Sequence, residues 1–240
     1  MRNSLTQYLA GDNLPVIEGD ALAKALAAAT EDATTGGGDG PDYLSFSGKS
    51  GLYSLGRDKV EIDPDQLYLV ETQSFSSGWI CWLKSKPVDR LEWSVFKPPS
   101  PLPTEDDLED HGPYRQASGD GWQQQLGFGA IGCDKVLSQL QFSTSSKSGR
   151  NSVGDLSKEI GTRSSAGEPH MPVIFFDSVE FEAQGNTNYK PVFTVEAWVG
   201  RPSAAAYLNG DMTVEQLVAG DAPKKLRSRA GGKKRGRGKK

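Results

Sequence analysis

Residues 171–200 read MPVIFFDSVEFEAQGNTNYKPVFTVEAWVG, and this stretch decides the fold. Segments 172–181 and 190–199 predict the two strands of one long β-hairpin, because apolar and polar residues alternate along much of their length. The residues between them, 183–189, are rich in turn formers and predict a loop. The first strand begins apolar on both faces and becomes amphipathic from Asp177, so we expect its start to be covered on both sides.

The second strand shows the alternation most clearly. A regular strand would place on one face Phe193, Val195, Ala197 and Val199, and on the other Val192, Thr194, Glu196 and Trp198. An isolated hairpin is only marginally stable in water, so the rest of the chain must supply the layers that cover it.

The middle of the chain supplies further strands and one helix. Short apolar runs between turn residues predict strands at 43–47, 52–55, 67–70, 78–83, 90–96, 122–131 and 136–142. A polar, basic loop is expected at 143–151, followed by a helix that Ser152 caps, with Asp155 at the acidic position of a capping box. This helix would carry Val153, Leu156 and Ile160 on one face and end near Gly161, and short helical segments are expected at 203–208 and 213–219.

Strands, then a helix, then a hairpin is the element order of an OB-fold. We therefore predict a mainly β fold with some α+β character, a barrel resembling an OB-fold with one helix between strands. Its predicted boundaries are a short N-terminal helix and Gly-rich linker at 1–41, the barrel at 42–200, short helices at 201–222 and a disordered basic tail at 223–240.

Charge is distributed unevenly along the chain. Of 27 Lys and Arg residues, ten lie in the tail, which has no Asp or Glu. The rest of the chain has 17 Lys and Arg residues and 31 Asp and Glu residues. An acidic body with a basic tail favours nucleic acid as a partner. A nuclear localisation signal and a tail that shields the acidic body until DNA displaces it are the two alternative uses of such a run.

Several other classes of protein are disfavoured. No apolar run is long enough to span a bilayer, so no membrane partner is expected. Two cysteines, Cys81 and Cys133, fit a reducing cytoplasm better than a disulfide scaffold. The sequence Gly48-Lys49-Ser50 lacks the glycine that a phosphate-binding loop requires five residues earlier, where Tyr43 stands.

Catalysis and cofactors are not expected either. The two histidines, His111 and His170, have no cysteine or carboxylate at a metal-ligand spacing. The Gly-x-Ser-x-Gly motif of a serine nucleophile is also absent from the sequence. We therefore expect no enzyme activity, no metal and no cofactor. Carboxylates such as Asp177, Glu180 and Glu182 leave a metal-dependent nuclease as a third hypothesis, with magnesium-dependent cleavage that a chelator abolishes.

Residues 171–178, MPVIFFDS, and residues 189–199, YKPVFTVEAWV, resemble segments of proteins from bacteriophage replication modules. In outline they are similar to phage single-stranded DNA-binding proteins. This resemblance implies an OB-like core, single-strand binding, and service to phage DNA replication or recombination in the cytoplasm of a bacterial host. It also implies phage or host replication proteins as partners. Many such proteins end in an acidic tail that recruits partners, whereas this chain ends in Lys and Arg.

Single-strand binding requires cations for the phosphates and aromatic faces for the bases. The cation candidates in the body, which we expect in loops or at strand ends, are Lys49, Arg57, Lys84, Lys86, Arg90, Lys147, Arg150 and Lys190. The aromatic candidates are Trp79, Trp82, Trp93 and Tyr189, although most strand tryptophans belong to cores. The tail contributes Lys224, Lys225, Arg227, Arg229, Lys233, Lys234, Arg235, Arg237, Lys239 and Lys240.

Two details sharpen this set. Trp79 and Trp82 are three residues apart, so they cannot share one face of a regular strand. Lys147 and Arg150 precede a helix N-terminus, which favours phosphate, although a polar loop without a ligand explains them equally well. The sequence thus predicts a protein that binds single-stranded DNA, with RNA and a homo-oligomer left open. A phage structural or scaffolding protein whose tail contacts DNA is the alternative.

Overall fold

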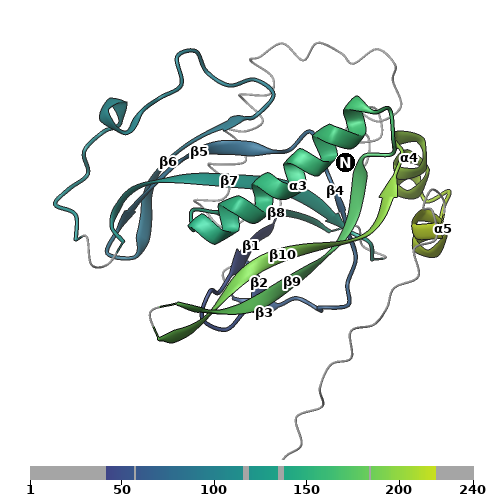
Figure 1. Cartoon of the computed structure of the whole chain (residues 1–240), viewed down its shortest axis with the longest axis horizontal. Helices are drawn as coiled ribbons and strands as arrows, with labels where there is room; N and C mark the ends of the chain where they lie inside the picture. The colour runs from purple at the N-terminus through teal and green to yellow at the C-terminus, as the bar shows by residue number, and fades with distance from the viewer. Residues whose placement is uncertain (1–41, 57, 116–118, 135–137, 184, 220–240) are drawn as a thin grey trace, which may run out of the picture.

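The computed structural model describes residues 42–56, 58–115, 119–134, 138–183 and 185–219. The predicted N-terminal helix and linker, Arg57 and the basic tail lie outside the described residues. In the described part the protein is mainly β, as predicted (Figure 1).

Ten strands form one sheet. They are β1 (Asp42–Phe46), β2 (Tyr53–Leu55), β3 (Val60–Glu61), β4 (Tyr68–Val70), β5 (Ser76–Leu83), β6 (Lys86–Ser94), β7 (Gly121–Gly132), β8 (Gln139–Thr144), β9 (Met171–Ala183) and β10 (Asn186–Val199). The strand order is β10-β9-β4-β7-β8-β1-β2-β3, and the β5–β6 hairpin joins the sheet through β7. All pairings are antiparallel except the parallel pair of β1 and β8.

The sheet curls into a half-barrel because its two ends contact each other. The Tyr53 hydroxyl on β2 donates to the Asp177 carbonyl on β9 at 2.8 Å. The Tyr189 amide on β10 donates to the Gly48 carbonyl in the β1–β2 turn, also at 2.8 Å. These contacts bring the long hairpin against the β1–β2 hairpin. The sequence predicts the β1–β2 hairpin correctly.

The long hairpin is confirmed, but its loop is shorter than predicted. Pairing continues to Ala183 and Asn186, so only positions 184 and 185 connect the strands. Gly185 has φ of +74°, a conformation that tight hairpin turns require and that glycine adopts without strain. The predicted loop at 183–189 is therefore wrong, and Tyr189 and Lys190 lie within β10 rather than in a loop or at a strand end.

A β-bulge at Glu196 changes the faces of β10. Pairing passes from Val195↔Ile174 directly to Ala197↔Val173, which leaves one extra residue on β10. Phe193 and Val195 consequently pack against the same cluster as Trp198, while Ala197 and Val199 belong to a different cluster. The prediction that Phe193 and Val195 share a face with Ala197 and Val199 is wrong, because the bulge reverses the alternation.

One helix, α3 (Lys147–Ser165), fills the inner face of the curled sheet. Its buried residues Val153, Leu156 and Ile160 join a cluster that includes Tyr53 from β2 and Phe176 from β9, whose ring centroids lie 5.2 Å apart. The three positions are those predicted to share one helix face. Because the helix packs on this face, the core residues of the sheet beneath it are covered.

The predicted ends of this helix are wrong. Ser146, not Ser152, is the N-cap: its hydroxyl accepts from the Gly149 amide at 3.1 Å. A Cβ at position 149 would clash with the Thr144 side chain, so glycine lets the first turn lie against β8. The helix also continues through Gly161, since burial of Ile160 in the core outweighs the low helix propensity of glycine.

A second, smaller cluster covers the start of the long hairpin on its other side. Met171, Val173 and Val199 pack there with residues of α4 (Arg201–Asn209) and α5 (Val214–Ala219). The two short helices and the double-sided burial of the first strand are therefore confirmed. Among the described residues, no helix combines the length and apolar character needed to cross a membrane.

Candidate nucleic-acid interface

Strand β5 presents one candidate tryptophan on each of its faces. Its pairing with β7 is regular from Trp79↔Gln124 to Trp82↔Gly121, so the two indoles project to opposite sides, as their spacing predicts. Trp79 is half-buried, and its Nε1 donates to the Pro103 carbonyl at 3.1 Å. Trp79 is therefore engaged by the β6–β7 loop, residues 95–120.

The β6–β7 loop is tied to the Trp79 face at further points. The indole Nε1 of Trp122 on β7 donates to the Glu109 carbonyl at 2.8 Å. The Cys81 thiol lies 3.7 Å from the Tyr114 hydroxyl. Burial raises the pKa of both Cys81 and Tyr114, so both groups stay neutral near pH 7.

The opposite face of β5 opens into a cleft of about 240 Å³, which we call the indole cleft. It is lined by Trp82, Ser85, Gly119, Gln123 and Ser145. In the part of the chain that the structure describes, the Trp82 Nε1 is buried and has no hydrogen-bond partner. An unpaired buried donor costs free energy, whereas the Trp79 indole donor is satisfied.

Predicted cations flank the indole cleft. Lys84 and Lys86 are exposed on either side of Ser85, in a tight turn where Lys84 and Ser85 have φ of 53° and 62°. Lys147 is exposed at the start of α3, two residues after Ser145. The Arg150 Nη1 donates to the Gln124 side-chain oxygen at 2.8 Å; Gln124 pairs with Trp79, so this contact lies on the opposite face of the sheet from the cleft residue Gln123.

Lys147 and Arg150 were expected in a loop before the helix, and that expectation is wrong. Both belong to the first turn of α3, because the helix begins at Lys147. The correction moves the helix N-terminus to the rim of the indole cleft. The first amides of a helix carry partial positive charge, which adds to the two side-chain charges.

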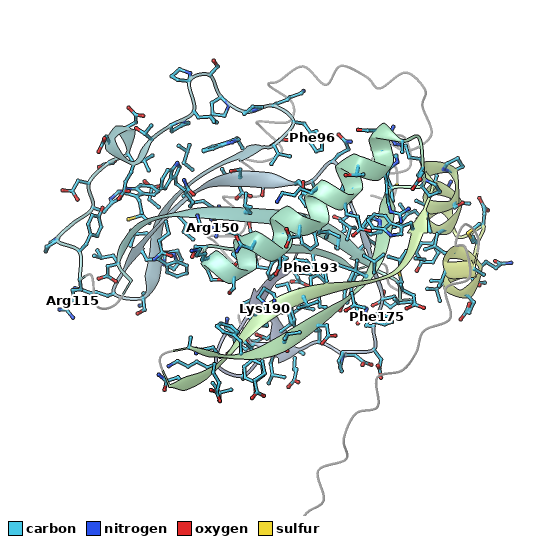
Figure 2. The ribbon with its side chains drawn as sticks, viewed as in Figure 1. Phe96, Arg115, Arg150, Phe175, Lys190 and Phe193 are labelled. Atoms are coloured by element: carbon cyan, nitrogen blue, oxygen red, sulfur yellow. The ribbon has the colours of Figure 1, made fainter. Side chains whose placement is uncertain are left out.

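Further contacts lead from α3 to the remaining candidates. The Ser152 hydroxyl donates to the Pro191 carbonyl of β10 at 2.7 Å, next to the exposed Lys190. The backbone contact of Tyr189 with Gly48 then reaches the turn that bears the exposed Lys49. Figure 2 shows Arg150 on α3 and Lys190 on β10, two elements that this contact joins. We call this series the cation path: Lys84, Lys86, Lys147, Arg150, Lys190 and Lys49.

The other predicted residues are less available. Trp93 is half-buried on β6, opposite Ser77 of β5. Arg90 forms an ion pair with Glu92 at 3.8 Å, and its guanidinium lies over the Tyr43 ring. The Tyr189 hydroxyl donates to the Glu180 carboxylate at 3.3 Å, so an acidic group stands beside that ring. Arg57 and the tail cations lie outside the described residues.

Sequence reasoning missed the polar lining of the indole cleft. Ser85, Gly119, Gln123 and Ser145 come from three separate segments, and nothing local marks them as neighbours. The run Gln123-Gln124-Gln125 is the one usable signal, because alternating positions in a polar strand place amides on both faces.

Among the residues that the structure describes, one group could hold a metal ion. Ligand atoms of Asp89, Glu109 and His111 all lie within 4.8 Å of one another. Sequence spacing indicated no metal-ligand set around either histidine, yet the His111 Nε2 is 2.9 Å from the Asp89 Oδ2. The fold, not the sequence spacing, brings these residues together.

Comparisons with models of protein families, with curated proteins and with solved structures found no match to this chain.

Proposed function

We propose that this protein binds single-stranded DNA along the cation path, with one base in the indole cleft and the basic tail adding non-specific affinity. The observation that carries the proposal is the indole cleft itself, which is lined by Trp82, by a turn that bears exposed lysines and by Ser145, just before the N-terminus of α3. Single-strand sites combine a cationic track for the backbone with an aromatic surface for bases, and both ingredients stand together here.

The size of the indole cleft suits a small flat group. At about 240 Å³ it lies below the roughly 300–1,000 Å³ of ordinary ligand pockets, so it suits one base rather than a folded ligand. A base would lie against the Trp82 ring. Because every base has a π-face, this contact would be tolerant of sequence.

Electrostatics would orient the strand. The chain outside the tail is strongly acidic, so phosphates are repelled from most of the surface and attracted to local cations. Neutralising six phosphates at the residues of the cation path would give a logarithmic salt slope of about −4 for the body alone. The tail would steepen this slope further.

The biological setting is part of the same proposal. The hairpin segments resemble phage single-stranded DNA-binding proteins, which supports a role in phage replication or recombination and replication proteins as partners. The OB-like interpretation belongs here too, since it rests on α3 preceding the final hairpin. RNA binding would use the same surface.

Fluorescence anisotropy with labelled single- and double-stranded DNA, across a salt series, tests the proposal. The full chain and a 1–222 truncation should both prefer single strands at low salt, and the truncation should show the shallower slope. Loss of all single-strand affinity with the tail would contradict the site on the body. In that case the structural or scaffolding alternative predicts the protein to be abundant in purified virions.

A further inference from the structure

The three potential ligands Asp89, Glu109 and His111 come from two segments that meet on the Trp79 face of β5. Asp89 lies on β6 directly opposite Cys81, and so shares that face, whereas Glu109 and His111 belong to the β6–β7 loop. The His111 Nε2 and Asp89 Oδ2 are 2.9 Å apart. All three groups reach solvent, since the Asp89 and His111 side chains are 41% and 24% exposed and Glu109 is exposed.

The surroundings fix the backbone that carries these ligands. The Arg90 amide donates to Asp89 Oδ1 at 2.7 Å, which leaves Oδ2 for another partner. The Trp122 indole donates to the Glu109 carbonyl at 2.8 Å, and the His111 amide donates to the Tyr114 hydroxyl at the same distance. The His111 ring also lies against the Trp122 ring, with centroids 5.8 Å apart. Metal sites characteristically have such an outer layer of contacts that orients the ligands.

We propose that Asp89, Glu109 and His111 bind one divalent transition-metal ion of the zinc class, with water completing its coordination. Two ligands at about 2.1 Å from such an ion stand roughly 3.0 to 3.4 Å apart, so the observed His–Asp separation requires only a small adjustment. On binding, the imidazole and the carboxylate exchange their mutual contact for bonds to the ion. The imidazole favours zinc-like ions over Mg²⁺ and Ca²⁺, which prefer oxygen ligands alone.

The ion would join the β6–β7 loop to β6. Within the described residues, the loop is tied to the sheet by isolated contacts, such as the hydrogen bond of Trp79 with Pro103 and the ring contact of His111 with Trp122. A metal bridge between Asp89 and the two loop residues would therefore stabilise the loop without contacting the indole cleft, which opens on the other face of β5. The site is independent of the proposed DNA binding.

Isothermal titration calorimetry of the untagged full chain with Zn²⁺, and separately with Mg²⁺, tests the site. We expect one Zn²⁺ per chain, a higher Tm with Zn²⁺ and no comparable Mg²⁺ binding. Glu109→Gln and His111→Ala should each weaken Zn²⁺ binding at least about tenfold, as removal of a ligand does.

His170→Ala is the matched control, because His170 Nδ1 lies near the Glu168 carbonyl, away from this group. It should leave the Zn²⁺ affinity unchanged, and Cys133→Ser should do the same. Glu109→Gln keeps the proposal testable even if His111→Ala misfolds, since the Glu109 side chain is exposed and its carbonyl contact remains. The proposal is overturned if the wild type binds no Zn²⁺, if Glu109→Gln binds it normally, or if a control abolishes binding.

Discussion

The two faces of β5 carry the same residue type in opposite roles. Trp79 lies under the β6–β7 loop, with its indole donor satisfied by Pro103. Trp82, three residues later, lines an open cleft, and its donor has no partner within the described residues. The first arrangement is that of a packing residue, and the second is the one at which we propose the base contact.

The difference between Trp79 and Trp82 shows that residue type alone does not determine whether a tryptophan packs in the fold or lines a cleft. The alternation of a strand separates the two indoles, but the covering segment decides which of them is structural. Here the cover comes from the part of the β6–β7 loop that holds Pro103, Glu109 and Tyr114, which contacts the Trp79 face. The experiments below test whether this separation of roles is real.

The largest effect is expected for Trp79→Ala. The substitution removes a half-buried ring and its bond to Pro103, so the free energy of unfolding should fall by about 3 kcal/mol. Urea denaturation followed by circular dichroism measures this loss. Trp79→Phe, which keeps an apolar ring but not the donor, should lose only about 1 kcal/mol.

Trp82→Ala in the same assay provides the comparison. It should cost clearly less stability than Trp79→Ala, because the ring lines a cleft and makes no hydrogen bond to protein. Equal losses for the two substitutions would show that both tryptophans are packing residues.

A smaller effect is expected on DNA binding by Trp82→Ala. Loss of one base contact should raise the Kd for single strands by about 5- to 30-fold, corresponding to about 1 to 2 kcal/mol. Anisotropy measurements on the 1–222 truncation avoid masking by the tail. Trp79→Phe serves as the control and should bind like the parent; a reversed order of the two variants would place DNA on the other face.

The smallest effect distinguishes two exposed lysines of α3. Lys147 lies at the rim of the indole cleft, whereas Lys158 lies in a later turn and pairs with Asp155 at 3.7 Å. Lys147→Gln should weaken single-strand binding by about twofold and reduce the salt slope by about 0.7. Lys158→Gln should change neither quantity, and a matching effect from both would indicate only general charge.

Local patterns predicted much of the fold. Turn residues and period-two alternation were sufficient for the long hairpin, the β1–β2 hairpin and the short C-terminal helices. The bulge at Glu196 was not predictable, because nothing in a regular alternation marks the extra residue. The start of α3 was missed because several hydroxyl residues precede it and each is a possible cap; packing of Gly149 against Thr144 selects Ser146.

The candidate site was predictable in its residue types but not in its assembly. The charges at Lys84, Lys147 and Arg150 were identified from sequence, yet their positions in space depend on tertiary contacts such as that of Arg150 with Gln124. The group of His111, Glu109 and Asp89 was missed for the same reason. A long loop that folds back onto its own hairpin leaves no periodic signal.

Hydrogen–deuterium exchange of the full chain, with and without an oligothymidine strand, tests the central claim most directly. Our account predicts slower exchange of amides at 82–87 and 145–151, around the indole cleft, and no change at 99–115. Protection at 99–115 without protection around the indole cleft would contradict it, as would DNA binding that protects no amide of residues 42–219.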